Sequence, residues 1–167
     1  PELVDTFSEH AYVSEAVAAE LGIPAGIPVS YRAGDQPNNA FSLNVLEPGE
    51  VAATAGTSGV VYGVSCSLSP DPKSRVNSFA HVNHTAAAKR IGVLLCINGT
   101  GILNSWLRKT MGAGISYEAM NELASKVGVG SEGVLVYPFG NGAERVLENA
   151  NPGAEIKGLS QIGRAHV

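Results

Sequence analysis

Residues 29–62 decide the fold. They open with Val29-Ser30-Tyr31-Arg32-Ala33-Gly34-Asp35-Gln36 and close with Val51-Ala52-Ala53-Thr54-Ala55-Gly56-Thr57-Ser58-Gly59-Val60-Val61-Tyr62. The first segment places a carboxylate directly after an apolar run, where glycine allows the chain to turn sharply. The second places backbone N–H groups and two hydroxyls in a tight turn between two β-prone runs. A carboxylate can take a proton from an alcohol, and a glycine turn can hold phosphate oxygens. Together they indicate phosphoryl transfer to a hydroxyl.

Each segment alone is ordinary turn chemistry, a Gly-Asp corner and a hairpin connection. Their order and the sequence around them make the pattern specific. Gly22-Ile23-Pro24-Ala25-Gly26-Ile27-Pro28-Val29 precedes them, and Pro48-Gly49-Glu50-Val51 lies between them. With these elements, the stretch from Gly22 to Val64 resembles the FGGY family of carbohydrate kinases, and its xylulokinases most closely.

The resemblance covers Ser14 to Leu159 and implies a fold class: α/β, with the ribonuclease-H-like fold of the actin/hexokinase ATPase superfamily. In that family ATP and sugar bind in the cleft between two such domains. We therefore expect residues 1–33 to end the first domain and residues 34–161 to begin the second. The family's Asp-x-Gly-x-Thr phosphate loop and its glycine-rich adenine loop do not occur in this sequence. We expect a fragment that is inactive alone.

The resemblance also assigns roles to single residues. Asp35 matches the catalytic base that accepts the proton of the sugar hydroxyl, and Gln36 matches a neighbour that hydrogen-bonds the sugar. Gly56, Thr57 and Ser58 match a hairpin that contacts the phosphates of ATP, which is used with Mg²⁺; no side chain is assigned to the metal. Gly99 and Gly101 either face the nucleotide or form a plain strand-to-helix turn.

Composition agrees with this interpretation. The chain has 167 residues, 44% hydrophobic and 16% charged, enough for one compact unit, with a net charge of −4 and a pI near 5.5. The acidic balance argues against nucleic acid or an anionic membrane as partner. We expect a cytoplasmic protein that binds a sugar and ATP and that could form a homodimer. Cys66 and Cys96 are expected to be buried, reduced thiols.

Hydrophobic periodicity and turn residues predict alternating helices and strands. Helices are expected around residues 13–21 and 37–46, after Gly101, and after a Ser116 cap, with Met120, Leu123, Ala124 and Val127 on one face. Strands are expected at residues 29–33, 51–54, 60–64, 78–82, 91–97 and 133–137. The chain starts at Pro1 in a polar, helix-leaning segment. Back-translated, residues 162–167 resemble a sequencing adapter, so we expect a non-native tail.

Several alternatives stay open at this stage. Pro37-Asn38-Asn39-Ala40-Phe41-Ser42 replaces a run that is small and Ala/Gly-rich in the family, so gluconate, ribulose or glycerol could replace a ketopentose such as xylulose. A non-catalytic sugar- or nucleotide-binding module of the same fold is a further alternative. A Ser58 hydrolase is disfavoured because Val60 stands where a nucleophile elbow needs glycine. A zinc site at His81 and His84 is disfavoured because no cysteine or carboxylate cluster supplies further ligands. Glu144 and Arg145 are expected to have a structural role.

Overall fold

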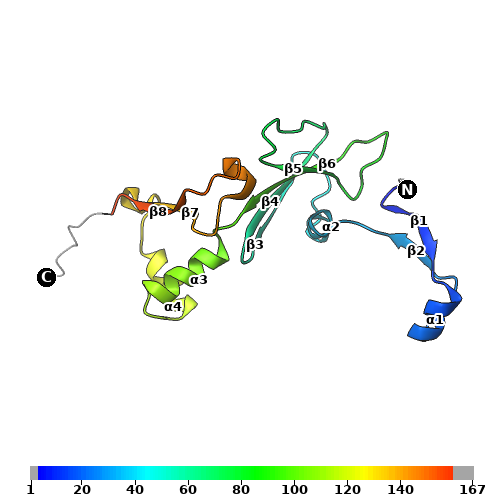
Figure 1. Cartoon of the computed structure of the whole chain (residues 1–167), viewed down its shortest axis with the longest axis horizontal. Coiled ribbons are helices and arrows are strands. Elements are labelled where there is room, and N and C mark those ends of the chain that lie inside the picture. Colours follow the sequence, from blue (N-terminus) through cyan, green and yellow to red (C-terminus); the bar gives the residue numbers. More distant parts are fainter. Residues whose placement is uncertain (1–3, 160–167) are drawn as a thin grey trace. The chain divides into compact units, whose positions relative to one another are not determined.

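The computed structural model describes residues 4–159, so the sequence at 162–167 that resembles an adapter lies outside the described residues. The chain divides into two compact units, which we describe one at a time. Figure 1 labels the helices and strands. The first unit holds the chain up to Ala53 together with Val61–Pro72 and Val76–Leu95. The second holds Thr54–Val60, Lys73–Arg75 and the chain from Cys96 onward.

The first unit begins with an antiparallel strand pair, β1 (Phe7–Tyr12) and β2 (Pro28–Tyr31), joined through helix α1 (Glu15–Leu21). The Ser14 hydroxyl accepts a hydrogen bond from the Val17 N–H, and Gly22 ends α1 at φ 67°. A serine cap and a left-handed glycine are the expected boundaries of a short helix. The helix here is confirmed, but the helix-leaning start is wrong, because β1 pairs with β2 instead.

Helix α2 (Asp35–Ser42) follows β2 and starts two residues earlier than the sequence predicted. Gly34 is its N-cap, and the first helical hydrogen bond runs from the Asn38 N–H to the Gly34 carbonyl at 3.0 Å. Pro37 does not mark the start, because proline is tolerated anywhere in a first turn whose N–H groups lack helical partners. Asp35 therefore lies on the first turn of a helix.

A four-stranded sheet follows, with the strand order β3-β4-β6-β5. Its strands are β3 (Val51–Ala55), β4 (Gly59–Ser65), β5 (Asn77–Ala80) and β6 (Ile91–Ile97). All four were predicted from the sequence to within three residues at each end. The sheet contributes most of the described core, with Ala52, Tyr62, Val64, Ile91 and Leu94 buried.

A buried polar contact crosses this core in the first unit. His81 is 0% exposed; its Nε2 lies 2.9 Å from the Val45 carbonyl oxygen and its Nδ1 lies 3.0 Å from the Tyr62 hydroxyl. A carbonyl can only accept, so Nε2 carries the proton and the Tyr62 hydroxyl donates to Nδ1. Burial lowers the pKa of His81 and raises the pKa of Tyr62 to about 12. Both groups are therefore neutral and serve as structural members of the core.

The second unit contains two helices, α3 (Gly101–Thr110) and α4 (Tyr117–Ser125), and an antiparallel pair, β7 (Leu135–Phe139) and β8 (Gly153–Lys157). Two short 3₁₀ turns, Ser131–Gly133 and Glu144–Leu147, complete it. The Ser116 hydroxyl caps α4 as predicted, by accepting from the Ala119 N–H. The helix ends before Val127, and β8 was not anticipated from the sequence.

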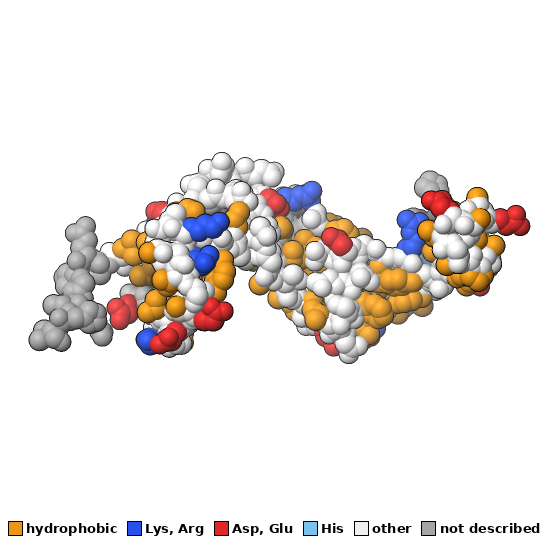
Figure 2. Space-filling view, turned by 90° about the horizontal axis from the view of Figure 1, so that it is seen from below, with side chains coloured by type: hydrophobic (Ala, Val, Ile, Leu, Met, Phe, Trp, Pro, Cys, Tyr) orange, Lys and Arg blue, Asp and Glu red, His pale blue; other side chains and the backbone are white. Residues whose placement is uncertain are grey.

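Many large apolar side chains of the described residues remain on the surface, as the orange areas of Figure 2 show. Phe41, Trp106 and Leu135 are examples. Exposed apolar surface of this kind favours association, so we expect the isolated chain to be poorly soluble. No helix in residues 4–159 is long and apolar enough to span a membrane.

Candidate functional site

One candidate site, in the first unit, is the start of α2. Asp35 is exposed, and its Oδ1 atom accepts a hydrogen bond from the Gln36 N–H at 2.8 Å. Among residues 4–159 no hydrogen bond or ion pair to Oδ2 is found. The carboxylate is therefore oriented by one backbone contact while its second oxygen remains available to a ligand.

An aromatic cluster lies beside this helix in the same unit. The ring of Tyr31 lies 5.0 Å from that of Phe7 and 6.1 Å from that of Phe41, and Phe7 and Phe41 meet edge to face at 5.8 Å. The Tyr31 hydroxyl donates to Oδ1 of Asn38 at 2.6 Å. The cluster thus connects the end of β2 to the first turn of α2, which carries Asp35.

A second candidate site, in the second unit, is the turn between β3 and β4, which lies against the start of α3. The Gly101 N–H donates to the Gly56 carbonyl at 2.9 Å, and the Ile102 N–H donates to the Thr57 carbonyl at 3.1 Å. The Thr100 hydroxyl lies 3.1 and 3.3 Å from the same two oxygens. Two adjacent carbonyls of the turn are thus held by the first residues of one helix, an arrangement we call the α3 clasp.

The α3 clasp decides where the N–H groups of the turn point. In a trans peptide the C=O and N–H bonds are roughly antiparallel. Because the carbonyls of Gly56 and Thr57 point at α3, the N–H groups of Thr57 and Ser58 point away from it. Neither N–H has a backbone partner within the described part of the chain. Two successive free N–H groups in a turn form a concave anion-binding surface.

Glycine is required at three positions around the clasp because other atoms come too close for a Cβ. A Cβ on Gly101 would lie 2.4 Å from the Gly56 carbonyl oxygen, and one on Gly99 would lie 2.0 Å from the Pro138 carbonyl oxygen. A Cβ on Gly59 would lie 2.5 Å from the Thr100 methyl group. The structure thus gives Gly99 and Gly101 a packing role, and the Gly101 N–H is already occupied. Contact with a nucleotide stays a prediction for both.

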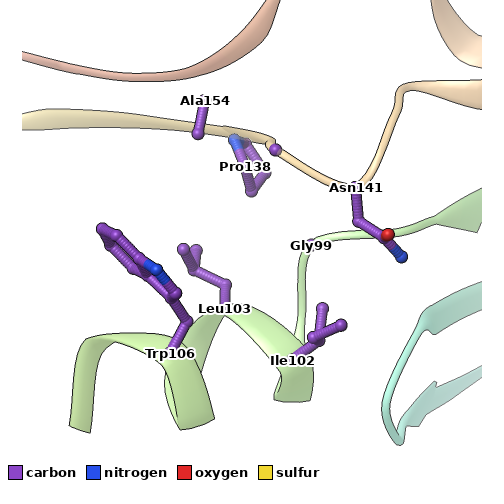
Figure 3. A pocket seen from close by; sticks show the side chains of 8 residues that line it. Gly99, Ile102, Leu103, Trp106, Pro138, Asn141 and Ala154 are labelled. Atoms are coloured by element: carbon purple, nitrogen blue, oxygen red, sulfur yellow. The ribbon is translucent and has the colours of Figure 1, made fainter. Parts of the chain in front are cut away.

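A pocket of about 360 Å³ opens next to the clasp, within the second unit. Figure 3 shows α3 forming one wall, with Trp106, Leu103 and Ile102, while Pro138 and Ala154 come from β7 and β8. Gly99 lies at the corner where β6 leads into α3. The volume lies in the roughly 300–1,000 Å³ range of small-molecule sites, and the lining is largely apolar. A flat aromatic ring is the kind of group that such a lining accommodates.

The structure brings together the five residues predicted to contact ATP. Gly56, Thr57, Ser58, Gly99 and Gly101 all belong to the second unit and meet around the clasp. Asp35 and Gln36 are neighbours in the first unit. Sequence reasoning missed Thr100, although its place between two glycines at a strand-to-helix corner was a usable signal.

Three further sequence expectations concern side chains outside the clasp. No group of three or more His, Cys, Asp or Glu side chains that could hold a metal occurs in residues 4–159. Both cysteines are free, but Cys66 is exposed, so its predicted burial is wrong; it follows β4 at a chain turn outside the core. Cys96 is half-buried, and burial together with the nearby Glu144 raises the pKa of its thiol. His84 is one of the two histidines considered for zinc, and its Nδ1 atom accepts a hydrogen bond from the Arg90 N–H at 3.1 Å.

The motif Pro48-Gly49-Glu50 has a structural role in the first unit. The Glu50 carboxylate accepts the N–H groups of Glu47 at 2.9 Å and Leu46 at 2.7 Å, and these bonds lower the pKa of Glu50. Gly49 adopts φ 94°, a conformation that favours glycine. This part of the resemblance therefore encodes a closed turn between α2 and β3.

Sequence comparison finds curated relatives among the sugar kinases, whereas no protein-family model matches the chain. A gluconokinase of Bacillus subtilis is 26% identical over 169 residues, which is 95% of this chain and 32% of the relative. A xylulose kinase of Staphylococcus epidermidis is 30% identical over 140 residues, which is 83% of this chain and 27% of the relative. The chain thus spans about a third of the length of the curated relatives it matches.

Solved structures give the same result for the fold. A gluconate kinase from Lactobacillus acidophilus matches 96% of this chain with a TM-score of 0.84 at 19% identity. A xylulose kinase from Rhodospirillum rubrum matches 98% with a TM-score of 0.83 at 24% identity. Each match covers 32% of the solved chain. The resemblance to FGGY carbohydrate kinases and the incomplete actin/hexokinase-type fold are therefore confirmed.

Proposed function

We propose that this chain of the FGGY sugar-kinase type is part of an enzyme that transfers the γ-phosphoryl group of ATP to a hydroxyl of a ketopentose such as xylulose. The observation that carries the proposal is the α3 clasp, which turns two free N–H groups of a Gly-Thr-Ser turn to one side. The sugar-kinase relatives support the same reaction class. The chain matches only part of each relative, so the activity belongs to the full-length protein.

Asp35 would act as the general base. Its Oδ1 is held by the Gln36 N–H, and its Oδ2 would accept the proton of the attacking hydroxyl. General-base help of this kind contributes typically ~10²–10⁴-fold to a rate. Gln36 is half-buried beside Asp35 and would hydrogen-bond a further oxygen of the sugar.

The turn at residues 56–58 would hold phosphate oxygens. The N–H groups of Thr57 and Ser58 would donate to the phosphate, together with the Thr57 hydroxyl. The turn fits an anion because its carbonyls, which would repel one, are turned into α3. When bound, ATP supplies the phosphoryl group, and Thr57 and Ser58 would hold its oxygens while the acceptor approaches.

The pocket beside α3 would contact an apolar part of the nucleotide, while the adenine loop of the family lies outside this sequence. Its walls from Trp106, Leu103 and Pro138 are apolar, and it lies in the same unit as the phosphate turn. Gly99 lines the pocket and would contact the nucleotide through its backbone, because the space beside its Cα is filled by Pro138. Mg²⁺ would accompany ATP, but the described residues form no cluster of ligands for it, so we assign it no step.

Gluconate is the second candidate substrate, favoured by the Bacillus subtilis gluconokinase, which aligns with 95% of this chain. We further propose that residues 1–33 close the first domain of the kinase and residues 34–161 begin the second. The partners would be a sugar and ATP, in a cytoplasmic enzyme that could be a homodimer. Because this sequence does not contain the Asp-x-Gly-x-Thr motif, we propose that the isolated chain has no kinase activity.

The test is a phosphotransfer assay on the full-length protein with ATP, Mg²⁺ and either D-xylulose or D-gluconate. The Asp35→Asn variant is compared with Asp5→Asn, which changes another exposed aspartate of the first unit. We expect Asp35→Asn to lose ~10²–10⁴-fold in kcat while retaining sugar binding, and Asp5→Asn to match the wild type. Turnover of Asp35→Asn at the wild-type rate would contradict the assignment.

A further inference from the structure

We infer that Asn38 is a specificity-determining residue of the acceptor site. Its side chain would donate a hydrogen bond to an uncharged oxygen of the sugar, one or two carbons from the hydroxyl that Asp35 activates. The inference rests on the proposed role of Asp35. It concerns a feature peculiar to this sequence, because Pro37-Asn38-Asn39 stands where the family resemblance leads one to expect small residues.

Asn38 is placed for this role by the geometry of α2. It follows Asp35 by three residues, and residues three apart on a helix are neighbours, with Cβ atoms ~5–6 Å apart. Both residues are exposed and lie in the first turn and a half of the helix. A sugar hydroxyl bound at Asp35 therefore brings its neighbouring oxygens within reach of the Asn38 side chain.

The orientation of the Asn38 amide is fixed. The Tyr31 hydroxyl donates to Oδ1 of Asn38 at 2.6 Å, and the Tyr31 ring is held by contacts with Phe7 and Phe41. The oxygen of the amide is thus committed to Tyr31. Its Nδ2 group, with two N–H donors, has no partner among residues 4–159. Asn38 therefore presents donors, in one rotamer, on the side of the helix that carries Asp35.

The pair of groups defines the chemistry that it recognises. Asp35 accepts a proton, and Asn38 donates hydrogen bonds, so together they fit a hydroxyl beside a second oxygen that accepts. A hydroxyl or ketone oxygen meets this requirement. A carboxylate at the same place would lie next to the negative charge of Asp35, which disfavours it. The expected acceptor is a polyol or ketose with an uncharged oxygen near the phosphorylated position.

The experiment compares the full-length wild type with Asn38→Ala on D-xylulose and on a series of xylulose analogues that each lack one hydroxyl. We expect Asn38→Ala to reduce kcat/KM for D-xylulose about tenfold or more, and to leave KM for ATP unchanged. For one analogue of the series, kcat/KM of the wild type should be lower than for D-xylulose by the same factor that Asn38→Ala causes with D-xylulose. With that analogue, Asn38→Ala should cause no further reduction of kcat/KM. Such non-additivity identifies the oxygen that Asn38 contacts.

Two further variants separate recognition from structure. Tyr31→Phe keeps the aromatic ring but removes the hydroxyl that orients Asn38, so we expect a smaller loss with the same dependence on the analogue. Asn151→Ala changes an exposed asparagine of the second unit and should behave as the wild type.

The outcomes distinguish this inference from the proposed function. If the wild type phosphorylates D-xylulose and Asn38→Ala loses nothing, or loses the same factor with every analogue, the inference is wrong and the proposed function stands. If the wild type phosphorylates neither D-xylulose nor D-gluconate, both are wrong. Loss confined to one oxygen supports both.

Discussion

The start of α2 and the turn at residues 56–58 carry the two halves of the proposed chemistry, and they are held in different ways. At α2 the carboxylate of Asp35 is exposed and has one hydrogen bond, from the adjacent Gln36 N–H. At the turn the carbonyls of Gly56 and Thr57 are held by two N–H groups and one hydroxyl from the start of α3. One half presents a side chain; the other presents backbone.

This difference has a consequence for substitution. A side chain on an exposed helix turn can be exchanged without moving its neighbours, so changes there affect chemistry more than stability. Backbone N–H groups are oriented by everything that holds their peptide planes, so changes around the turn affect stability and binding together. The predictions on Gly101, Thr100 and Asp35 test this contrast, and one on His81 tests the buried core of the first unit. They are given in order of decreasing effect on the free energy of unfolding.

The largest effect is expected from Gly101→Ala. The new Cβ would lie 2.4 Å from the Gly56 carbonyl oxygen, so the turn and α3 must separate. Overpacking of this kind destabilises by about 1–3 kcal/mol or more. We expect a lower unfolding temperature and a raised KM for ATP in the full-length protein. Gly63→Ala is the control, because its Cβ would meet the nearest side-chain atom at 3.8 Å. Equal unfolding temperatures for the two variants would contradict a rigid clasp.

The next effect concerns pH and the first unit. Burial lowers the pKa of His81 in the folded protein, against about 6.5 when unfolded. Below that pH the unfolded chain binds a proton at His81, whereas the buried imidazole of the folded protein stays neutral to a lower pH. Stability is therefore fully present above pH 6.5 and falls as the pH decreases, by at most about 1.4 kcal/mol per pH unit. Unfolding measured between pH 5 and 8 should show this slope, and His81→Gln should flatten it.

The control for that experiment is His10→Gln. His10 is half-buried in β1, where its Nε2 contacts the Thr6 carbonyl, and its replacement should leave the slope in place. A slope that survives in His81→Gln would assign the pH dependence to other groups.

The sequence predicted the sheet well and the ends of the chain poorly, for a physical reason. β6 is a continuous apolar run, Ile91–Ile97, and Gly56–Gly59 is a recognisable turn, so both carry their structure locally. β1 reads Phe-Ser-Glu-His-Ala-Tyr, which is polar and without a clear period, and it is a strand because it pairs with β2. Its structure depends on a partner whose position in space the sequence does not give.

The candidate site shows the same limit. The Gly-Asp-Gln and Gly-Thr-Ser-Gly motifs could be found because glycine and its neighbours are adjacent in sequence. The α3 clasp could not, because Thr100 lies 44 residues from Gly56 and reaches it only through the fold. The Tyr31–Asn38 contact joins residues only seven apart in sequence. It could not be predicted because it depends on where α2 begins, and the sequence placed that boundary at Pro37 and not at Asp35. The roles assigned to Asp35, Gln36 and the turn stay predictions.

A smaller effect is expected from Thr100→Val, which keeps the shape of the side chain and removes the hydroxyl. Gly56 and Thr57 then keep the N–H bonds from Gly101 and Ile102 and lose the third donor. A hydrogen bond of this kind contributes about 1 kcal/mol. We expect a small loss of stability and a raised KM for ATP with an unchanged KM for the sugar. Thr100→Ser retains the hydroxyl and should restore the KM for ATP; failure to do so would locate the effect in the methyl group.

The smallest effect on stability is expected from Asp35→Asn, although its effect on turnover is the greatest of all. The asparagine oxygen can still accept from the Gln36 N–H, and the exposed position places no packed neighbour at risk. The lost charge at a helix start costs about 0.3–1 kcal/mol at low salt and less at physiological ionic strength. The unfolding temperature should therefore stay within about a degree or two of the wild type. A large fall would mean that Asp35 supports the fold, and the contrast between an exchangeable side chain and a constrained backbone would then be wrong at the residue on which the proposed chemistry depends.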